Sequence, residues 1–279
     1  MKRSLVQSIA LYTGVLCLAA FTLAPLAWLV LMSVSSPDDL VQVPLNWWPA
    51  RIDFSRYAAL TDLDQEQGQR FLAALRNSLI AAGGATAIAL IIAVPAAYAF
   101  ARRGASMARL FGFLATIMMP PITYVLPLYH VFGAFGLLNS LITLIVVYAA
   151  MLLPFAIWLM KANLDVLPVE VELDAFMEGA STLYALRRVV LPIALPAIAA
   201  TAILSFLVAW DEFFYALIFT SDLSAKTLPV AIADFSAGRV TDYGVIAALG
   251  VLATLPPAVL AILFQRFIVS GLVAGRVKG

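Results

Sequence analysis

The chain has 279 residues, of which 63% are hydrophobic and 12% are charged, and its formal net charge is +1. A soluble domain with so few charges would expose apolar patches larger than soluble monomers tolerate. The apolar runs also lack the alternating polarity of a transmembrane β-barrel, and a single cysteine excludes an internal disulfide and a zinc site built on paired cysteines. The composition therefore predicts an all-α protein that crosses a membrane several times.

Six segments are apolar over the length that a bilayer requires, about 20 residues per helix. Their orientation follows from lysine and arginine, which concentrate on the cytoplasmic side of a membrane. With the N-terminus inside, the inner segments hold eleven of the 17 basic residues and the outer segments hold six, so we expect both termini in the cytoplasm. The expected spans are Ile9–Ser33, Leu75–Ala101, Leu110–Phe132, Leu141–Met160, Ile193–Thr220 and Tyr243–Phe267.

The first connection between spans is the longest and lies outside in this topology. It contains "PLNWWPARIDFSRY", residues 44–57. Trp47 and Trp48 suit either the aromatic belt at the membrane interface or contact with an external partner. The expected parts are a cytoplasmic N-terminus (1–8), the first span (9–33), the outer loop (34–74), a five-span core (75–267) and a cytoplasmic tail (268–279).

Prolines fall inside several of the expected spans. Pro95 lies in the second span and Pro154 in the fourth, whereas the third span contains Pro120, Pro121 and Pro127. A proline inside a helix removes a hydrogen bond and clashes with the preceding turn. We therefore expect the pair at 120 and 121 to kink or interrupt the third span.

The connection between the fourth and fifth spans, residues 163–191, is charged although apolar spans flank it, and we call it the charged segment. From residue 170 it reads "EVELDAFMEGASTLYALRRVVLP". Pro168 suits the first turn of a helix, and Glu170 and Glu172 complement the positive end of that helix. Apolar residues then recur at helical spacing beside the acidic ones.

Signals for a helix end and a second helix follow at once. Gly179 permits the left-handed turn that terminates a helix. Ser181 or Thr182 can cap a second short helix through Val190, after which Pro192 opens the fifth span. Two short helices at a bend predict a rigid projection from the membrane face.

This projection resembles the EAA loop of binding-protein-dependent ABC import permeases, whose pattern is roughly P-x-E-L-x-E-A-A-x-x-D-G-A-S followed by I-x-L-P. The E-A-A positions hold Leu173, Asp174 and Ala175 here, and Glu178 replaces the usual aspartate before the glycine. Whether Glu172, one residue earlier, takes over the role of the missing glutamate is open. The matching residues are Pro168, Glu170, Gly179, Ala180, Ser181, Leu191 and Pro192.

The resemblance extends over almost the whole chain, because an ordered set of short motifs is similar to the sugar-uptake branch of this family. That branch is typified by the second permease of maltose-, trehalose- and glycerol-phosphate-type importers. The motifs are "NSL" at 77–79, "AYAFAR" at 97–102, "PLY" at 127–129, "GLLNS" at 136–140, "LPFAIW" at 153–158, "WDEF" at 210–213 and "QRFIVSGLVAGRVKG" at 265–279.

The resemblance implies a six-span permease of the type I ABC importer fold, in the cytoplasmic membrane of a bacterium or archaeon. A second permease subunit would complete the pathway, and an extracytoplasmic binding protein would deliver a sugar or polyol. A homodimer of ATPase subunits would bind ATP and Mg²⁺, since none of the chain's four lysines follows a glycine as a P-loop requires. The chain itself would hold no cofactor, would catalyse no reaction and would bind no nucleic acid.

The resemblance also implies that residues 168–191 form a coupling helix seated in a cleft of one ATPase. An amphipathic helix at the membrane surface without a partner is the alternative. The implied coupling residues are Glu170, Glu172, Leu173, Asp174, Phe176, Met177, Glu178, Gly179, Ala180, Ser181 and Leu183.

Two acids in the expected fifth span are candidates for the translocation pathway. A charge at such depth costs about 2.5–3.5 kcal/mol on insertion scales and normally faces a cavity or a partner. Asp211 and Glu212 would bind sugar hydroxyls or brace the outer gate, or else pair with Arg76 or with the second permease. Aromatic side chains near the breaks of the third span could stack on a sugar ring or simply pack in the bundle. The pathway candidates are Tyr124, Tyr129, Trp210, Asp211 and Glu212.

Three other functions compete with import of a sugar. A glycerol phosphodiester is an alternative substrate within the same branch. A transporter driven by an ion gradient commonly shows internal repeats and ionisable residues near the midplane, whereas this chain has an off-centre acid pair. A membrane enzyme would need a convergent nucleophile, base or metal set, and one histidine and one cysteine do not supply it.

Overall fold

The computed structural model of the chain describes residues 5–44, 47–236 and 242–274, and the side chains among them from residue 6 to residue 265. The expected N-terminal charges Lys2 and Arg3, the outer Arg239, and the tail residues Arg276 and Lys278 lie outside the described residues. The side chain of Arg266 lies outside them as well.

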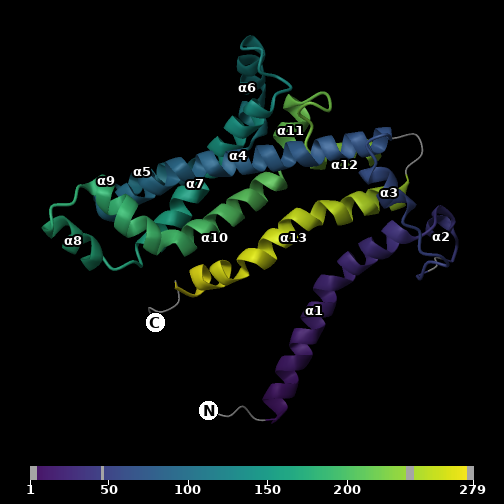
Figure 1. Cartoon of the computed structure of the whole chain (residues 1–279), viewed down its shortest axis with the longest axis horizontal. Helices are drawn as coiled ribbons and strands as arrows, with labels where there is room; N and C mark the ends of the chain where they lie inside the picture. The colour runs from purple at the N-terminus through teal and green to yellow at the C-terminus, as the bar shows by residue number, and fades with distance from the viewer. Residues whose placement is uncertain (1–4, 45–46, 237–241, 275–279) are drawn as a thin grey trace. The chain divides into compact units, whose positions relative to one another are not determined.

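The described residues form helices joined by short connections, and no strand occurs among them (Figure 1). The all-α architecture predicted from composition is thus confirmed. The elements are α1 (Leu5–Val34), α2 (Pro37–Val41), α3 (Ser55–Thr61), α4 (Glu66–Arg102), α5 (Met107–Ile117), α6 (Ile122–Ala134), α7 (Leu141–Leu164), α8 (Glu170–Met177), α9 (Thr182–Ala185), the π-helical turn η1 (Leu186–Val190), α10 (Leu191–Trp210), α11 (Phe214–Phe219), α12 (Leu228–Ser236) and α13 (Tyr243–Ala274).

Five helices of the described chain are long and apolar enough to cross a membrane, and a bent pair makes a sixth if it is one span. The pair is α5 and α6, which meet at an angle of 85°. Pro120 and Pro121 lie between them, where the sequence predicts an interruption. The five single spans are Val6–Val34, Glu66–Arg102, Leu141–Leu164, Thr182–Trp210 and Tyr243–Gln265.

The fifth span differs from the prediction at both of its ends. The helix runs without interruption from Thr182 to Trp210, so Pro192 does not open it. Instead the helix widens to the π-turn η1 immediately before this proline, whose ring removes one ordinary helical hydrogen bond. At the other end the helix stops at Trp210, and a new short helix, α11, covers the residues that we expected to continue the span to Thr220.

The described residues divide into two compact units, one of residues 1–72 and 231–255 and the other of residues 73–230 and 256–279. In the first unit Arg56 is buried, with 7% of its surface exposed. It donates hydrogen bonds to the carbonyl oxygens of Ser33 and Ser35 and lies 3.5 Å from the carboxylate of Asp242. The tryptophans of the outer loop are both exposed, and Trp47 packs against Trp28 of α1 with ring centroids 5.4 Å apart.

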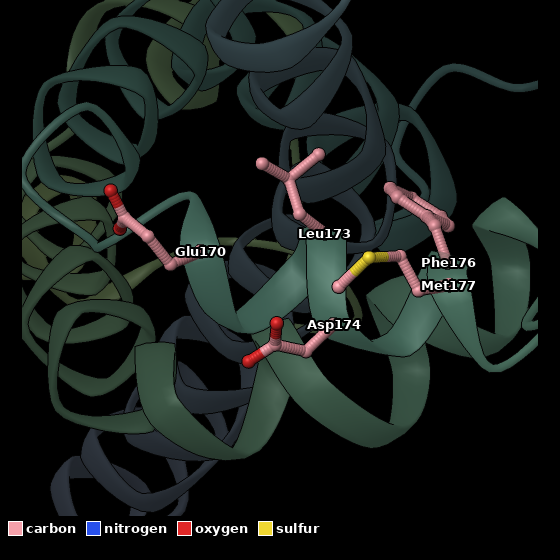
Figure 2. A pocket seen from close by; sticks show the side chains of 5 residues that line it. All are labelled: Glu170, Leu173, Asp174, Phe176 and Met177. Carbon is pink, nitrogen blue, oxygen red and sulfur yellow. The ribbon is translucent and has the colours of Figure 1, made fainter.

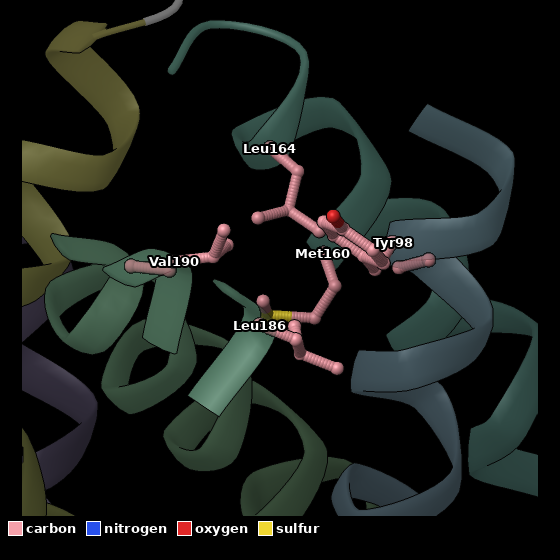
Figure 3. Close-up of a cluster of buried hydrophobic side chains, with 7 residues drawn as sticks. Tyr98, Met160, Leu164, Leu186 and Val190 are labelled. Atoms are coloured by element: carbon pink, nitrogen blue, oxygen red, sulfur yellow. The ribbon is translucent and has the colours of Figure 1, made fainter. Parts of the chain in front are cut away.

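The second unit contains the charged segment and the helices that hold it. Its core uses a stripe of fully buried alanines along α4, spaced four residues apart, where the absence of bulk lets neighbouring helices approach closely. A cluster of buried side chains from α4, α7, η1 and α10 continues this packing at the base of the charged segment (Figure 3). The alanines of the stripe are Ala81, Ala85, Ala89, Ala93 and Ala97.

Candidate functional site

The charged segment has the predicted short helix α8 and the predicted turn after it. The predicted second short helix is not separate, because α9 and η1 are the start of the continuous helix from Thr182 to Trp210. Helix α8 ends at Met177, and Gly179 takes the left-handed conformation with φ +87°. The amide of Ala180 donates to the carbonyl of Ala175 at 3.0 Å, which closes the helix end. Of the two possible caps, Ser181 is the one used, because its hydroxyl accepts a hydrogen bond from the amide of Tyr184 at 3.3 Å.

Helix α8 presents apolar side chains to the outside. Leu173 and Met177 are 52% and 80% exposed, and Phe176 is 37% exposed. Together with Glu170 and Asp174 they line a surface pocket of about 460 Å³, and Figure 2 shows these five side chains around it. A group of exposed apolar side chains on one short helix is typical of a surface that a partner or a membrane covers. The neighbouring α9 adds Leu183, which is 55% exposed.

Glu172 lies on the opposite side of α8 and is buried, with 4% of its surface exposed. Its Oε1 accepts a charge-assisted hydrogen bond from Nε of Arg102 at 2.7 Å, and its Oε2 accepts one from the hydroxyl of Tyr98 at 2.9 Å. Arg102 also donates to the carbonyl of Leu167 at 2.9 Å. Glu172 therefore does not lie on the exposed side of α8. The exposed acids of α8 and the residue that follows it are Glu170, Asp174 and Glu178.

Arg102 and Tyr98 are site residues that sequence reasoning missed. Both belong to the "AYAFAR" motif at 97–102. The available signal was their spacing, since residues four apart on a helix share one face. The next residue, Arg103, donates to the hydroxyl of Thr182 at the start of α9, so the end of α4 holds both arms of the charged segment.

The pathway candidates do not gather around one point. Tyr124 comes together with Tyr215 of α11, whose hydroxyl donates to it at 2.7 Å, and Tyr129 stacks on Phe219 with ring centroids 6.4 Å apart. The Tyr124–Tyr215 pair lines a cavity of about 440 Å³ whose other walls are almost wholly apolar. Sequence reasoning missed Tyr215, because nothing in the sequence predicts that α11 exists as a separate helix.

Asp211 and Glu212 lie in the break after α10 rather than within a helical span. Glu212 accepts hydrogen bonds from the amides of Tyr215 at 2.9 Å and Ala216 at 3.3 Å, and so satisfies the free N–H groups that begin α11. Asp211 is exposed. The expected alternative, in which these acids pair with Arg76, is absent from the ion pairs of the described residues.

The remaining pathway candidate, Trp210, is a core residue. It is 4% exposed and stacks on Phe206 with ring centroids 5.6 Å apart. His130 is exposed, and its ring lies nearly perpendicular to that of Tyr129, with ring centroids 6.5 Å apart. Within the described ranges, no group of three or more histidine, cysteine, aspartate or glutamate side chains could hold a metal ion.

Two asparagines, each from a motif that resembles the sugar-uptake branch, hold the connection between α11 and α12. Asn77 of "NSL" donates to the carbonyls of Leu223 and Lys226 at 2.9 and 3.0 Å. Asn139 of "GLLNS", with φ +55°, donates to the carboxylate of Asp222 at 2.7 Å and accepts from the amide of Ser221 at 2.9 Å. The hydrogen bond from Asn139, with others from Ser224, lowers the pKa of Asp222 to about 2.

The fold is that of an importer permease. The chain superimposes with a TM-score of 0.75 and 24% identity on a chain in the crystal structure of a bacterial ABC transporter involved in the import of the acidic polysaccharide alginate. The match covers 95% of this chain and 99% of that one.

Residues 85–273 match the family described as binding-protein-dependent transport system inner membrane component, and the chain belongs to this family. It is 32% identical over the full length of both chains to the trehalose/maltose transport system permease protein MalG of Thermococcus litoralis. It is 34% identical to the trehalose transport system permease protein SugB of Mycobacterium tuberculosis, over 93% of each chain. It is also 34% identical to the sulfoquinovosyl glycerol transport system permease protein SmoH of Agrobacterium fabrum, over 92% of this chain and 89% of that one.

Proposed function

We propose that the chain is one of two permease subunits of an ATP-driven sugar importer, and that residues 168–191 couple it to a separate ATPase. The observation that carries the coupling is the apolar row Leu173, Phe176 and Met177 on the exposed side of α8. Large apolar side chains that line a surface pocket are the usual anchors of a protein interface. The fixed turn at Gly179 and the buried contacts of Glu172 hold this row in place before a partner arrives.

The charges beside the anchors define the partner surface. Glu170, Asp174 and Glu178 follow one another at four-residue intervals, which places them along one side of the helix. No ion pair of the described residues involves them. A complementary ATPase cleft would therefore have an apolar floor and basic residues at its rim. These three acids, rather than a glutamate at position 173, would provide the electrostatic part of docking.

A sugar is the substrate class best supported by the relatives. By their names, one relative transports trehalose or maltose, a second transports trehalose, and a third takes up diacetylchitobiose. A fourth transports sulfoquinovosyl glycerol, in which a glycerol is joined to a sugar. A glycerol phosphodiester remains the second candidate within the branch. Transport driven by an ion gradient is not favoured, because the family works with a binding protein.

The assembly that we propose lies in the cytoplasmic membrane of a bacterium or archaeon, with both termini of this chain and the charged segment inside. A second permease completes the pathway, a homodimer of ATPase subunits binds ATP and Mg²⁺, and a binding protein docks outside. The chain itself needs no cofactor and catalyses no reaction. Of the pathway candidates we retain Tyr124, Tyr129 and the exposed Asp211, because Trp210 is buried in the core and Glu212 is engaged by backbone amides.

Purification of the tagged chain from detergent-solubilised membranes tests this proposal. We expect a second six-span permease and an ATPase with P-loop motifs to co-purify, after which the accompanying binding protein can be screened with maltose, trehalose and glycerol phosphodiesters. Recovery of the chain alone, together with uptake by vesicles that contain no ATP, would replace the importer by a gradient-driven transporter.

A further inference from the structure

Tyr98, Arg102 and Glu172 form a polar joint between α4 and α8, and it has features that simple packing of the charged segment does not need. Tyr98 and Arg102 lie four residues apart on α4 and both end on the carboxylate of Glu172. In the ion pair, the side chain of Arg102 is 9% exposed and that of Glu172 is 5% exposed. A buried ion pair contributes little net stability compared with apolar residues of the same size, so its presence at this place calls for another role.

The joint fixes the charged segment to α4 on both sides of the turn at Gly179. Arg102 reaches Glu172 in the first arm and the carbonyl of Leu167 just before it, and Arg103 reaches Thr182 in the second arm. Directional hydrogen bonds of this kind fix orientation, which an apolar contact alone does not.

An apolar cluster backs the polar joint. The ring of Tyr98 packs in the apolar cluster, and its hydroxyl donates to Glu172 in the polar joint. Figure 3 shows the labelled side chains Tyr98, Met160, Leu164, Leu186 and Val190, which come from α4, α7 and η1, gathered in one place. The cluster thus joins η1, at the end of the charged segment, to α4 and α7, whereas α8 is held to α4 through Glu172.

We propose that Glu172, Arg102 and Tyr98 form the joint through which movement of the charged segment reaches α4, with Glu172 and Arg102 acting as positioning residues for coupling. This inference rests on the proposed function, because it needs an ATPase to move the segment. When the ATPase closes on the exposed side of α8, the inward-facing Glu172 pulls on Arg102 and so tilts α4. The two sides of α8 then have separate roles. The exposed side, which includes Leu173 at the glutamate position of the EAA pattern, docks on the ATPase, and the side with the buried Glu172 transmits the movement.

The test measures movement of α4 rather than uptake. The exposed Cys17 is replaced by serine, and a cysteine at Ile91, which is 73% exposed on α4, carries an environment-sensitive fluorophore. Position 91 is eleven residues from Arg102, or about 16 Å along the helix. The purified complex is then trapped with ATP and vanadate, and the shift in fluorescence is recorded together with the amount of trapped nucleotide.

We expect a shift in the otherwise unaltered complex, and a shift about tenfold smaller in Glu172→Gln and in Arg102→Met, because each leaves one buried partner unsatisfied. Nucleotide trapping should continue in both variants. The matched control is Asp165→Asn, which breaks the ion pair of Lys161 and Asp165 near the end of α7 without touching α8. It should keep the full shift.

A double variant separates positioning from folding. If the single variants are poorly assembled, Arg102→Met combined with Glu172→Met should restore assembly, because apolar pairs replace buried ion pairs at little cost. The inference requires that the fluorescence shift stays lost in this variant, and a full shift would overturn it. A full shift in Glu172→Gln, or trapping without any shift in the unaltered complex, would also overturn it and leave the proposed function intact. Absence of an ATPase from the purified complex would instead remove both.

Discussion

Glu212 is a charged residue in an apolar region whose partners are backbone amides. Its two carboxylate oxygens accept from Tyr215 and Ala216 at the start of α11. A helix start leaves N–H groups without partners, and in an apolar environment each unsatisfied group is costly. The acid is therefore explained by the break in the fifth span, whereas Asp211 beside it is exposed and has no such task.

Substitutions at these two positions should have different effects. Glu212→Ala removes both acceptors and should lower stability by about 1 kcal/mol, as loss of a helix cap does. Glu212→Gln keeps an acceptor oxygen and should lose much less. Asp211→Asn serves as the control and should not change stability, because Asp211 is exposed. The measurement is thermal unfolding of the purified protein in detergent. Equal stability of Glu212→Ala and Glu212→Gln would show that the cap is not what the side chain provides.

At the scale of elements, the turn between α8 and α9 depends on one backbone conformation. A side chain at Gly179 would meet no heavy atom within 4 Å, so crowding does not require the glycine. Its φ of +87° does, because residues with a Cβ adopt this region only with strain. The position of α8 relative to α9, and with it the exposed apolar row, follows from this residue.

Gly179→Val should abolish transport while the chain remains in the membrane, because a strained turn displaces α8. Gly179→Asn should retain part of the activity, since asparagine enters the left-handed region more easily than valine. Gly136→Val is a matched control, as Gly136 has φ +65° and open space around it but lies before α7. ATPase recovered with the tagged chain is the measurement. Normal recovery and uptake with Gly179→Val would contradict a role of this turn in coupling.

At the scale of the whole molecule, the sequence predicts the features whose cause is local. Pro120 and Pro121 interrupt the third span, Gly179 ends a helix, and Ser181 caps the next. The outcomes at Gly179 and Ser181 need no knowledge of neighbouring helices. The outcome at a proline pair does, because Pro256 and Pro257 lie inside the continuous helix α13. The helical class follows from composition, because only a few architectures satisfy backbone groups in a membrane.

The features that sequence reasoning missed are those that depend on distant residues. Glu172 looks like its neighbouring acids in sequence, and only the approach of Arg102, 70 residues earlier, makes it a buried residue. The end of α10 at Trp210 was also missed, since the apolar run continues through α11 without glycine or proline. The burial of Trp210 beside this helix end likewise depends on its packing partners and is not visible in the sequence.

The separation of α8 into a docking side and an anchored side leads to a prediction about the complete complex. Phe176→Ala combined with Met177→Ala removes the exposed anchors and should reduce the ATPase recovered with the tagged chain by about tenfold, because a few apolar anchors hold most of the energy of an interface. The matched control is Val171→Ala on the same helix. Val171 is 40% exposed but does not line the pocket of the apolar row.

Both variants keep Glu172 and Gly179, so the fold of the segment should be unchanged and the amounts in the membrane should be equal. Recovery that falls in the double variant and persists in Val171→Ala would place the ATPase contact on the pocket side of α8. Equal recovery from the two would mean that the ATPase binds another part of the chain, and the exposed apolar row would then need a different partner.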